Sequence, residues 1–164
     1  RLMAGEMRAD AGRLELRCHS LAEHPDAYRS RVFWADPRSD ALDAVSPLAY
    51  WGALPRRYPA FNHELLADLI EGFDLAQHQE KALYMLSTGT RRKVWLAAAF
   101  ASGADLTLLD EPFAALDRAS IRLVLELLED AASHPMRAWV VADYAPPQGV
   151  PLGATMELQS LPNR

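Results

Sequence analysis

Apolar and polar positions follow a strand period in some parts of the chain and a helix period in others. Residues 12–18 alternate in the manner of a half-exposed strand, and residues 31–35 form a second short strand that Asp36 and Pro37 end. Between about 39 and 86 the pattern becomes helical and is interrupted by prolines. A leucine stripe at i, i+4 spacing there predicts a helix that starts near Asn62.

In the second half of the chain, predicted helices alternate with short apolar strands. This alternation is typical of a parallel sheet that is buried on both faces. We therefore expect an α/β fold. The expected helices cover residues 88–101 and 117–132, and the expected strands cover 106–109, 138–142 and about 154–158.

The change in pattern near residues 39 and 86 suggests how the chain is organised. With 164 residues, half of them apolar, the chain is long enough for one well-packed domain. We expect residues 1–38 and 87–164 to form its α/β core, and about 39–86 to form an inserted helical subdomain.

The composition argues against several classes of function. A net charge of −5 argues against a nucleic-acid-binding surface, and Arg91, Arg92 and Lys93, the densest basic cluster, are too few to change that. The single cysteine, Cys18, excludes an intrachain disulfide and favours a reducing compartment. The histidines lack metal-ligand spacing, and the tryptophans lie in apolar stretches that are typical of a core.

Two acidic residues follow the apolar strand at 106–109. Parallel strands bind ligands at their carboxyl ends, so Asp110 and Glu111 are expected at such an edge. A carboxylate there can hold Mg²⁺ in phosphoryl transfer, and a neighbouring carboxylate can take the proton of an attacking water. Taken alone, the two acids and Pro112 are equally consistent with a strand that ends in a turn.

Ser87 and Asp117 each precede a predicted helix. A helix start exposes unpaired amides and the positive end of the dipole, which together bind anions. Ser87 is followed by Gly89, which we expect to remove a side chain where a phosphate approaches closely. For Ser87 alone an ordinary helix cap is the better interpretation, and Asp117 is also a good cap for the helix after it.

In their order and spacing these segments resemble three motifs of the ATP-binding cassette (ABC) ATPases. Residues 86–90 resemble the signature motif, 108–112 the Walker B strand and 115–117 the D-loop. The resemblance implies the fold of a P-loop NTPase, with a mostly parallel sheet and an inserted helical subdomain. It also implies that Asp110 associates with Mg²⁺ and that Glu111 is the general base.

The resemblance further implies how ATP is contacted. Ser87, Thr88, Gly89 and Thr90 would bind the γ-phosphate of an ATP that a partner subunit holds, although Thr88 and Thr90 replace the usual Gly and Gln. Asp117 would lie at the interface between the two subunits.

The sequence departs from the family pattern at three places. No Gly-Lys pair is present, so the Walker A loop is missing, and the chain starts where the helix after that loop would end. We expect an N-terminally truncated chain that is inactive alone. Ala35 or Asp36 stands where the family has Gln, and Asp143 where it has the switch His. An ionised Asp cannot donate a hydrogen bond to a phosphate, so we expect slow turnover.

The function implied by the resemblance is that of the ATP-binding, ATP-hydrolysing subunit of an ABC transporter. Its cofactors would be ATP and Mg²⁺, and its partners a second such subunit, as homo- or heterodimer, and an integral membrane permease, with no nucleic acid. It would be cytoplasmic and peripheral on the inner face of the plasma membrane. The alternatives are a soluble ABC-type ATPase that acts on ribosomes or DNA, and a catalytically degenerate interaction module.

Overall fold

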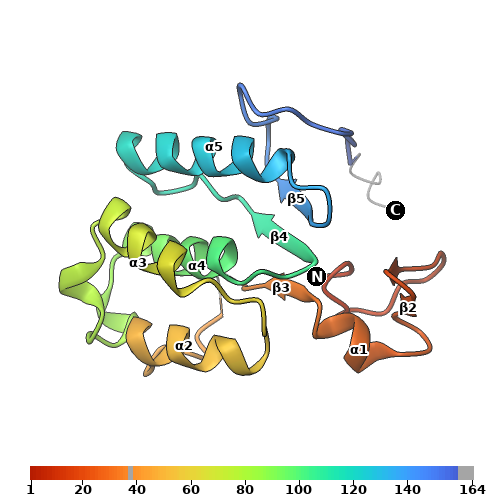
Figure 1. Ribbon diagram of the computed structural model, residues 1–164, viewed down its shortest axis with the longest axis horizontal. Coiled ribbons are helices and arrows are strands. Elements are labelled where there is room, and N and C mark those ends of the chain that lie inside the picture. The colour runs from red at the N-terminus through yellow and green to blue at the C-terminus, as the bar shows by residue number, and fades with distance from the viewer. Residues whose placement is uncertain (37–38, 159–164) are drawn as a thin grey trace, which may run out of the picture.

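A parallel sheet lies at the centre of the computed structural model, which describes residues 1–36 and 39–158 (Figure 1). Within these residues the sheet has three strands in the order β3-β4-β5, and all of them are parallel. Neighbouring strands are in register at Trp34 and Leu108, and at Leu108 and Val140. The predicted α/β class and parallel sheet are confirmed. The strands are β3 (Val32–Trp34), β4 (Leu106–Asp110) and β5 (Ala138–Ala142).

The predicted strand at 12–18 is present only as a short antiparallel pair. β1 (Glu15–Leu16) pairs with β2 (His19–Ser20), and the two residues between them form the turn. Arg17 adopts a left-handed conformation in that turn, with φ of +60°. The alternation along 12–18 therefore predicted one continuous strand, whereas the chain reverses direction within this segment. Pro37, expected to end the next strand, lies outside the described residues.

The strand predicted near residues 154–158 is wrong. This segment has no strand assignment, and Met156 and Leu158 are 83% and 88% exposed. Alternation of apolar and polar residues is not sufficient for a strand, because its backbone also needs a neighbour with which to form hydrogen bonds.

The helices predicted from near Asn62, at 88–101 and at 117–132 are present, whereas the short helix at 25–29 was not predicted. Side-chain caps explain where several of the helices start. Asn62 caps α3 by accepting a hydrogen bond from the Leu65 amide at 3.0 Å, and Ser46 caps α2 in the same way. The helices are α1 (Pro25–Arg29), α2 (Pro47–Ala53), α3 (His63–Gly72), α4 (Thr88–Ala101) and α5 (Arg118–Ala132), with single 3₁₀ turns η1 (Leu54–Arg56), η2 (Ala76–His78) and η3 (Leu83–Met85).

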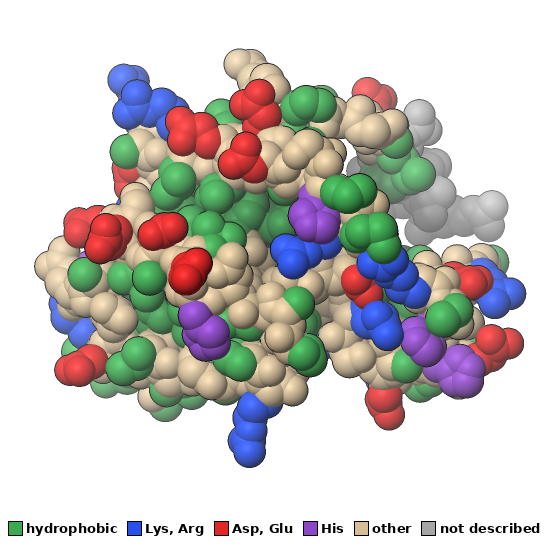
Figure 2. Space-filling model, viewed as in Figure 1, with side chains coloured by type: hydrophobic (Ala, Val, Ile, Leu, Met, Phe, Trp, Pro, Cys, Tyr) green, Lys and Arg blue, Asp and Glu red, His purple; other side chains and the backbone are tan. Residues whose placement is uncertain are grey.

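A buried apolar cluster joins α2, α3, α4, α5 and one face of the sheet. Trp51 of α2, Leu69 of α3 and Val124 of α5 are at most 2% exposed in this cluster. The second half of α4 is buried on all sides and lies at its centre. Figure 2 shows apolar side chains in the gap between α5 and α3, with acidic side chains around them. Part of the other face of the sheet, at Leu106 and Leu108, packs against Tyr28 of α1.

The end of α4 is tied to the segment before α3. The Asn62 amide donates to the Ala101 carbonyl at 2.8 Å. Gly103 then turns the chain with φ of +68°, and a Cβ at this position would overlap the Ala60 backbone. Only glycine combines this conformation with so close an approach.

An ion-pair cluster at the amino end of the sheet gives a prediction for acid stability. Burial raises the pKa of Asp105, but hydrogen bonds from Arg17 and Arg31, at 3.0 and 2.8 Å, outweigh this effect and lower it overall. A lowered pKa in the folded state stabilises the fold above the unfolded-state pKa, and this contribution is lost as pH falls through the folded-state pKa.

We therefore expect Asp105→Asn to lower the free energy of unfolding by about 1 kcal/mol at pH 7. The loss should shrink towards zero as the pH falls through the lowered pKa of Asp105, where the carboxylate itself becomes protonated. Urea denaturation of both proteins across this pH range measures the effect. A difference that stays constant with pH would show that the carboxylate charge is not responsible.

Candidate functional site

The candidate site lies at the carboxyl edge of the parallel sheet. Asp110 is the last residue of β4 and is exposed, and the half-buried Glu111 follows it. The Glu111 amide donates to the Ala142 carbonyl of β5 at 2.8 Å. Because Ala142 pairs with Asp110 and directly precedes Asp143, the fold brings all three predicted acidic residues to this edge.

Glu111 and Asp143 differ in their local structure. Glu111 has φ of +45°, a left-handed conformation that is uncommon for a residue with a side chain. Asp143 is exposed, and its Oδ1 accepts a hydrogen bond from the Tyr144 amide at 2.7 Å. Strained backbone is often found at functional sites, so the conformation of Glu111 is a feature of interest here.

Ser87 caps α4, the helix that carries the rest of the predicted phosphate contacts. Its Oγ accepts a hydrogen bond from the Thr90 amide at 3.1 Å and lies 2.8 Å from Thr90 Oγ1. Ser87 and Thr88 are exposed, whereas Thr90 is half-buried. The cap expected for Ser87 is therefore present, and the start of α4 is open to solvent at its first residues.

Gly89 is required by a close contact within the chain. A Cβ at this position would overlap the backbone carbonyl oxygen of Ala115, which has φ of +60°. This close approach is to the loop before α5 in the same chain. The predicted approach of a phosphate to Gly89 stays a prediction.

Asp117 is held by contacts within the chain. Its Oδ1 accepts from the Ser120 amide at 2.9 Å, so it caps α5 as predicted. Its Oδ2 lies 2.6 Å from Lys93 Nζ and accepts from Ser120 Oγ at 3.0 Å. Hydrogen bonds from Lys93 and then from Ser120 lower the pKa of Asp117 well below its usual range, so it is ionised at neutral pH.

The sequence analysis missed the role of the basic cluster at the start of α4. Arg91 pairs with Asp43 at 2.5 Å and donates to the Ser39 carbonyl at 3.0 Å. Arg92 and Lys93 instead reach the loops after β4. Charge counting gave no signal for these contacts, because they depend on how segments far apart in the sequence pack together.

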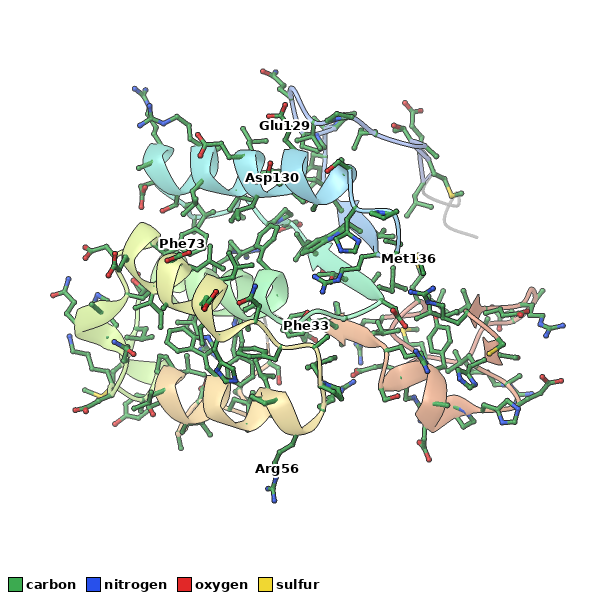
Figure 3. The ribbon with its side chains drawn as sticks, viewed as in Figure 1. Phe33, Arg56, Phe73, Glu129, Asp130 and Met136 are labelled. Atoms are coloured by element: carbon green, nitrogen blue, oxygen red, sulfur yellow. The ribbon has the colours of Figure 1, made fainter. Side chains whose placement is uncertain are left out.

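The same three residues therefore connect the start of α4 to three other segments. Arg92 Nη1 donates to the backbone carbonyls of Asp110, at 3.1 Å, and Glu111. Lys93 Nζ contacts Asp117 and, at 3.4 Å, the Phe73 carbonyl. Figure 3 shows Phe73 at the end of α3. Arg92 and Lys93 thus hold together the loops that carry the predicted site residues, whereas Arg91 contacts the segment at 39–43.

The described residues can hold a divalent cation only together with other ligands. No group of three or more His, Cys, Asp or Glu side chains in residues 1–36 and 39–158 is arranged to hold a metal ion. Mg²⁺ is commonly bound through one or two carboxylates, with phosphate oxygens and water completing its shell. The exposed Asp110 carboxylate beside Glu111 fits that kind of site.

A small cavity next to this edge is too small for a nucleotide. It has a volume of about 30 Å³, close to the space that a single water molecule occupies, and it lies between β3, α4 and β4. Asp110, Arg92, Trp95 and Phe33 are among the residues that line it. This cavity therefore cannot hold a nucleotide.

Comparison with known proteins connects this geometry to one family. A family model described as ABC transporter matches residues 1–114. The cytochrome c biogenesis ATP-binding export protein CcmA of Pseudomonas syringae pv. syringae (strain B728a) is 29% identical over 136 residues, which cover 82% of this chain and 63% of CcmA. The daunorubicin/doxorubicin resistance ATP-binding protein DrrA of Streptomyces peucetius is 30% identical, over 78% of this chain and 40% of DrrA. The chain thus spans less than two thirds of the length of these relatives.

Solved structures support the fold. The ATP-binding subunit of an ABC transporter superposes with a TM-score of 0.75 at 21% identity, over 87% of this chain and 60% of that one. A dimeric post-hydrolysis state of an ATP-binding cassette, bound to ADP and Pi, gives a TM-score of 0.69 at 16% identity, over 88% and 67% of the two chains.

Proposed function

Because this chain belongs to the ABC transporter family, we propose that it supplies the hydrolytic carboxylates and the signature helix of an ATP-binding subunit that powers a membrane permease. The observation that carries the proposal is the placement of Asp110 and Glu111 at the carboxyl edge of the parallel sheet. This is the edge at which open α/β folds bind their ligands. Asp110 would associate with Mg²⁺, and Glu111 would accept a proton from the attacking water.

The start of α4 would act on a second nucleotide. Ser87, Thr88, Gly89 and Thr90 would contact the γ-phosphate of an ATP that is held mainly by a partner subunit. The exposure of Ser87 and Thr88 supports this proposal, since a partner can reach them. An α-helix start also attracts anions through its free amides and its dipole. Asp117 would lie at the same interface while it caps α5.

ATP binding would then drive two subunits together, and hydrolysis would separate them. Residues of about 39–86 would contact the permease and pass this movement to it. Among the described residues no helix is both long and apolar enough to cross a bilayer. We propose a peripheral position at the cytoplasmic face of the membrane, where the permease would hold the subunit.

We also propose that hydrolysis is slow, because Asp143 stands at the position of the switch His. It follows β5 at the sheet edge, beside the backbone of Glu111, and it is exposed. An ionised carboxylate cannot donate a hydrogen bond to a phosphate, and the loss of one such donor typically costs about 10²–10³ in rate.

The test uses the protein expressed from its complete reading frame in its own host. We expect a tagged copy, purified from detergent-solubilised membranes, to carry a polytopic membrane protein and to hydrolyse ATP when Mg²⁺ is present. EDTA should abolish that activity. Co-purification with ribosomes or nucleic acid would favour a soluble ABC-type ATPase instead. A protein that neither binds nor hydrolyses ATP would favour an interaction module.

A further inference from the structure

Arg92 joins the signature helix to the backbone of both candidate catalytic carboxylates. Its side chain leaves the second turn of α4 half-buried and crosses to the end of β4. There Nη1 donates to the carbonyls of Asp110 and Glu111. Hydrogen bonds from a charged donor are about twice as strong as those between neutral groups. Arg92 therefore contacts the chain at the point where the two carboxylates branch from it.

The backbone at Glu111 needs such support. A left-handed conformation is unfavourable for a residue with a Cβ, and Glu111 has φ of +45°. Such a conformation persists only where the surroundings hold it. Hydrogen bonds to both sides of the residue hold it: the Glu111 amide donates to the Ala142 carbonyl, and the Glu111 carbonyl accepts from the Ala114 amide at 3.1 Å and from Arg92. They come from the sheet, from the turn that follows Glu111, and from α4.

We propose that Arg92 is a positioning residue that sets the direction of the Glu111 carboxylate. The proposal rests on the proposed function, in which Glu111 is the general base. Because φ and ψ at Glu111 fix the direction of its Cα–Cβ bond, loss of the charged Arg92 donor would loosen this peptide, even with the Ala114 amide in place, and would shift the carboxylate relative to the attacking water. A displacement of about 1 Å is enough to slow catalysis severely.

Arg92 also makes this chain's own carboxylate sensitive to what happens at the start of α4. The first residues of that helix would contact the nucleotide of the partner subunit, and Arg92 lies only five residues beyond Ser87. A shift of α4 on closure would therefore move the Arg92 guanidinium and, with it, the Glu111 peptide.

The test compares Arg92→Met with a matched neighbour in the protein expressed from its complete reading frame. We expect Arg92→Met to lower kcat about 10-fold and to leave KM for ATP within about 2-fold, because geometry at the reacting water is lost while nucleotide contacts remain. Arg92→Lys should recover part of kcat, since one ammonium can still donate to a carbonyl. The control is Arg91→Met, which removes the same charge from a residue that contacts Asp43 and Ser39 instead. Its kcat should stay near that of the wild type.

A double mutant separates positioning from a general loss of structure. In a Glu111→Gln background, Arg92→Met should cause no further loss of the residual rate, because the two residues act as one unit. An additive loss would overturn the proposal, as would a wild-type kcat in Arg92→Met. If Arg92→Met does not fold, Arg92→Lys decides, and a kcat equal to that of the wild type overturns the proposal.

Failure of the proposed function would give a different result. In that case the wild-type protein itself has no Mg²⁺-dependent ATPase activity, or Glu111→Gln retains it in full. A wild-type protein that hydrolyses ATP, is inactivated by Glu111→Gln and is indifferent to Arg92→Met contradicts only the role of Arg92.

Discussion

Glu111→Gln lowers the rate of ATP hydrolysis by about 10²–10³-fold in the protein expressed from its complete reading frame, and it leaves ATP binding intact. The amide has nearly the shape of the carboxylate but cannot accept a proton at neutral pH. Glu111 lies half-buried at the sheet edge beside Asp110, where a base for water is expected. Single-turnover hydrolysis measures the rate, and equilibrium binding of a fluorescent ATP analogue measures the affinity.

The matched control for this experiment is Glu129→Gln. Glu129 is exposed on α5, and Figure 3 shows it on the outer side of that helix. The same chemical change there should leave both rate and affinity unaltered. Retained turnover in Glu111→Gln would exclude Glu111 as the base. Loss of ATP binding together with turnover would assign Glu111 to nucleotide contacts instead of proton transfer.

Gly89→Ala is expected to have the second large effect, this time on stability. Its new methyl group would overlap the Ala115 carbonyl oxygen, and a backbone atom cannot move aside as a flexible side chain does. Overpacking of this kind costs about 1–3 kcal/mol in free energy of unfolding. Displacement of the loop before α5 would also loosen the Lys93–Asp117 contact.

Gly52→Ala provides the comparison for this substitution. Gly52 lies inside α2, and a Cβ there would meet no atom within 4 Å. Alanine is a better helix residue than glycine, so this variant should gain about 0.5–1 kcal/mol. If the close approach at Gly89 is real, urea denaturation will show a lower free energy of unfolding for Gly89→Ala and a higher one for Gly52→Ala than for the wild type. A Gly89→Ala protein as stable as the wild type would contradict it.

Local signals in the sequence were sufficient for three of the helices and for the three strands of the described parallel sheet. Asn62 was expected near the start of α3 and caps it, and the expected helix at 88–101 has the bounds of α4. The strand at 138–142 also has its expected bounds. In each case the pattern of apolar residues and the cap act over a few neighbouring residues, so the sequence alone contains the necessary information.

Contacts between distant segments were not predictable in this way. Arg92 and the carbonyl of Glu111 are 19 residues apart, and Gly89 and Ala115 are 26 apart, so their contacts depend on how helices and loops pack. The same reason explains the false strand at 154–158, where alternation was present but no neighbouring strand was. The family was identified correctly from the order of the motifs, whereas the chemical roles of the site residues stay predictions.

The apolar cluster shared by α2, α3, α4 and α5 has a mechanical consequence. It crosses the proposed boundary between the helical part and the α/β core, and α4 runs through its centre. Close-packed interiors deform little and transmit strain. A load applied to α2 would therefore tilt α4 as a stiff lever, with the Asn62–Ala101 hydrogen bond and the tight turn at Gly103 as its fulcrum. Ser87 lies at the opposite end of α4 from this pivot, so the largest displacement would occur at the residues that we propose to face a partner subunit.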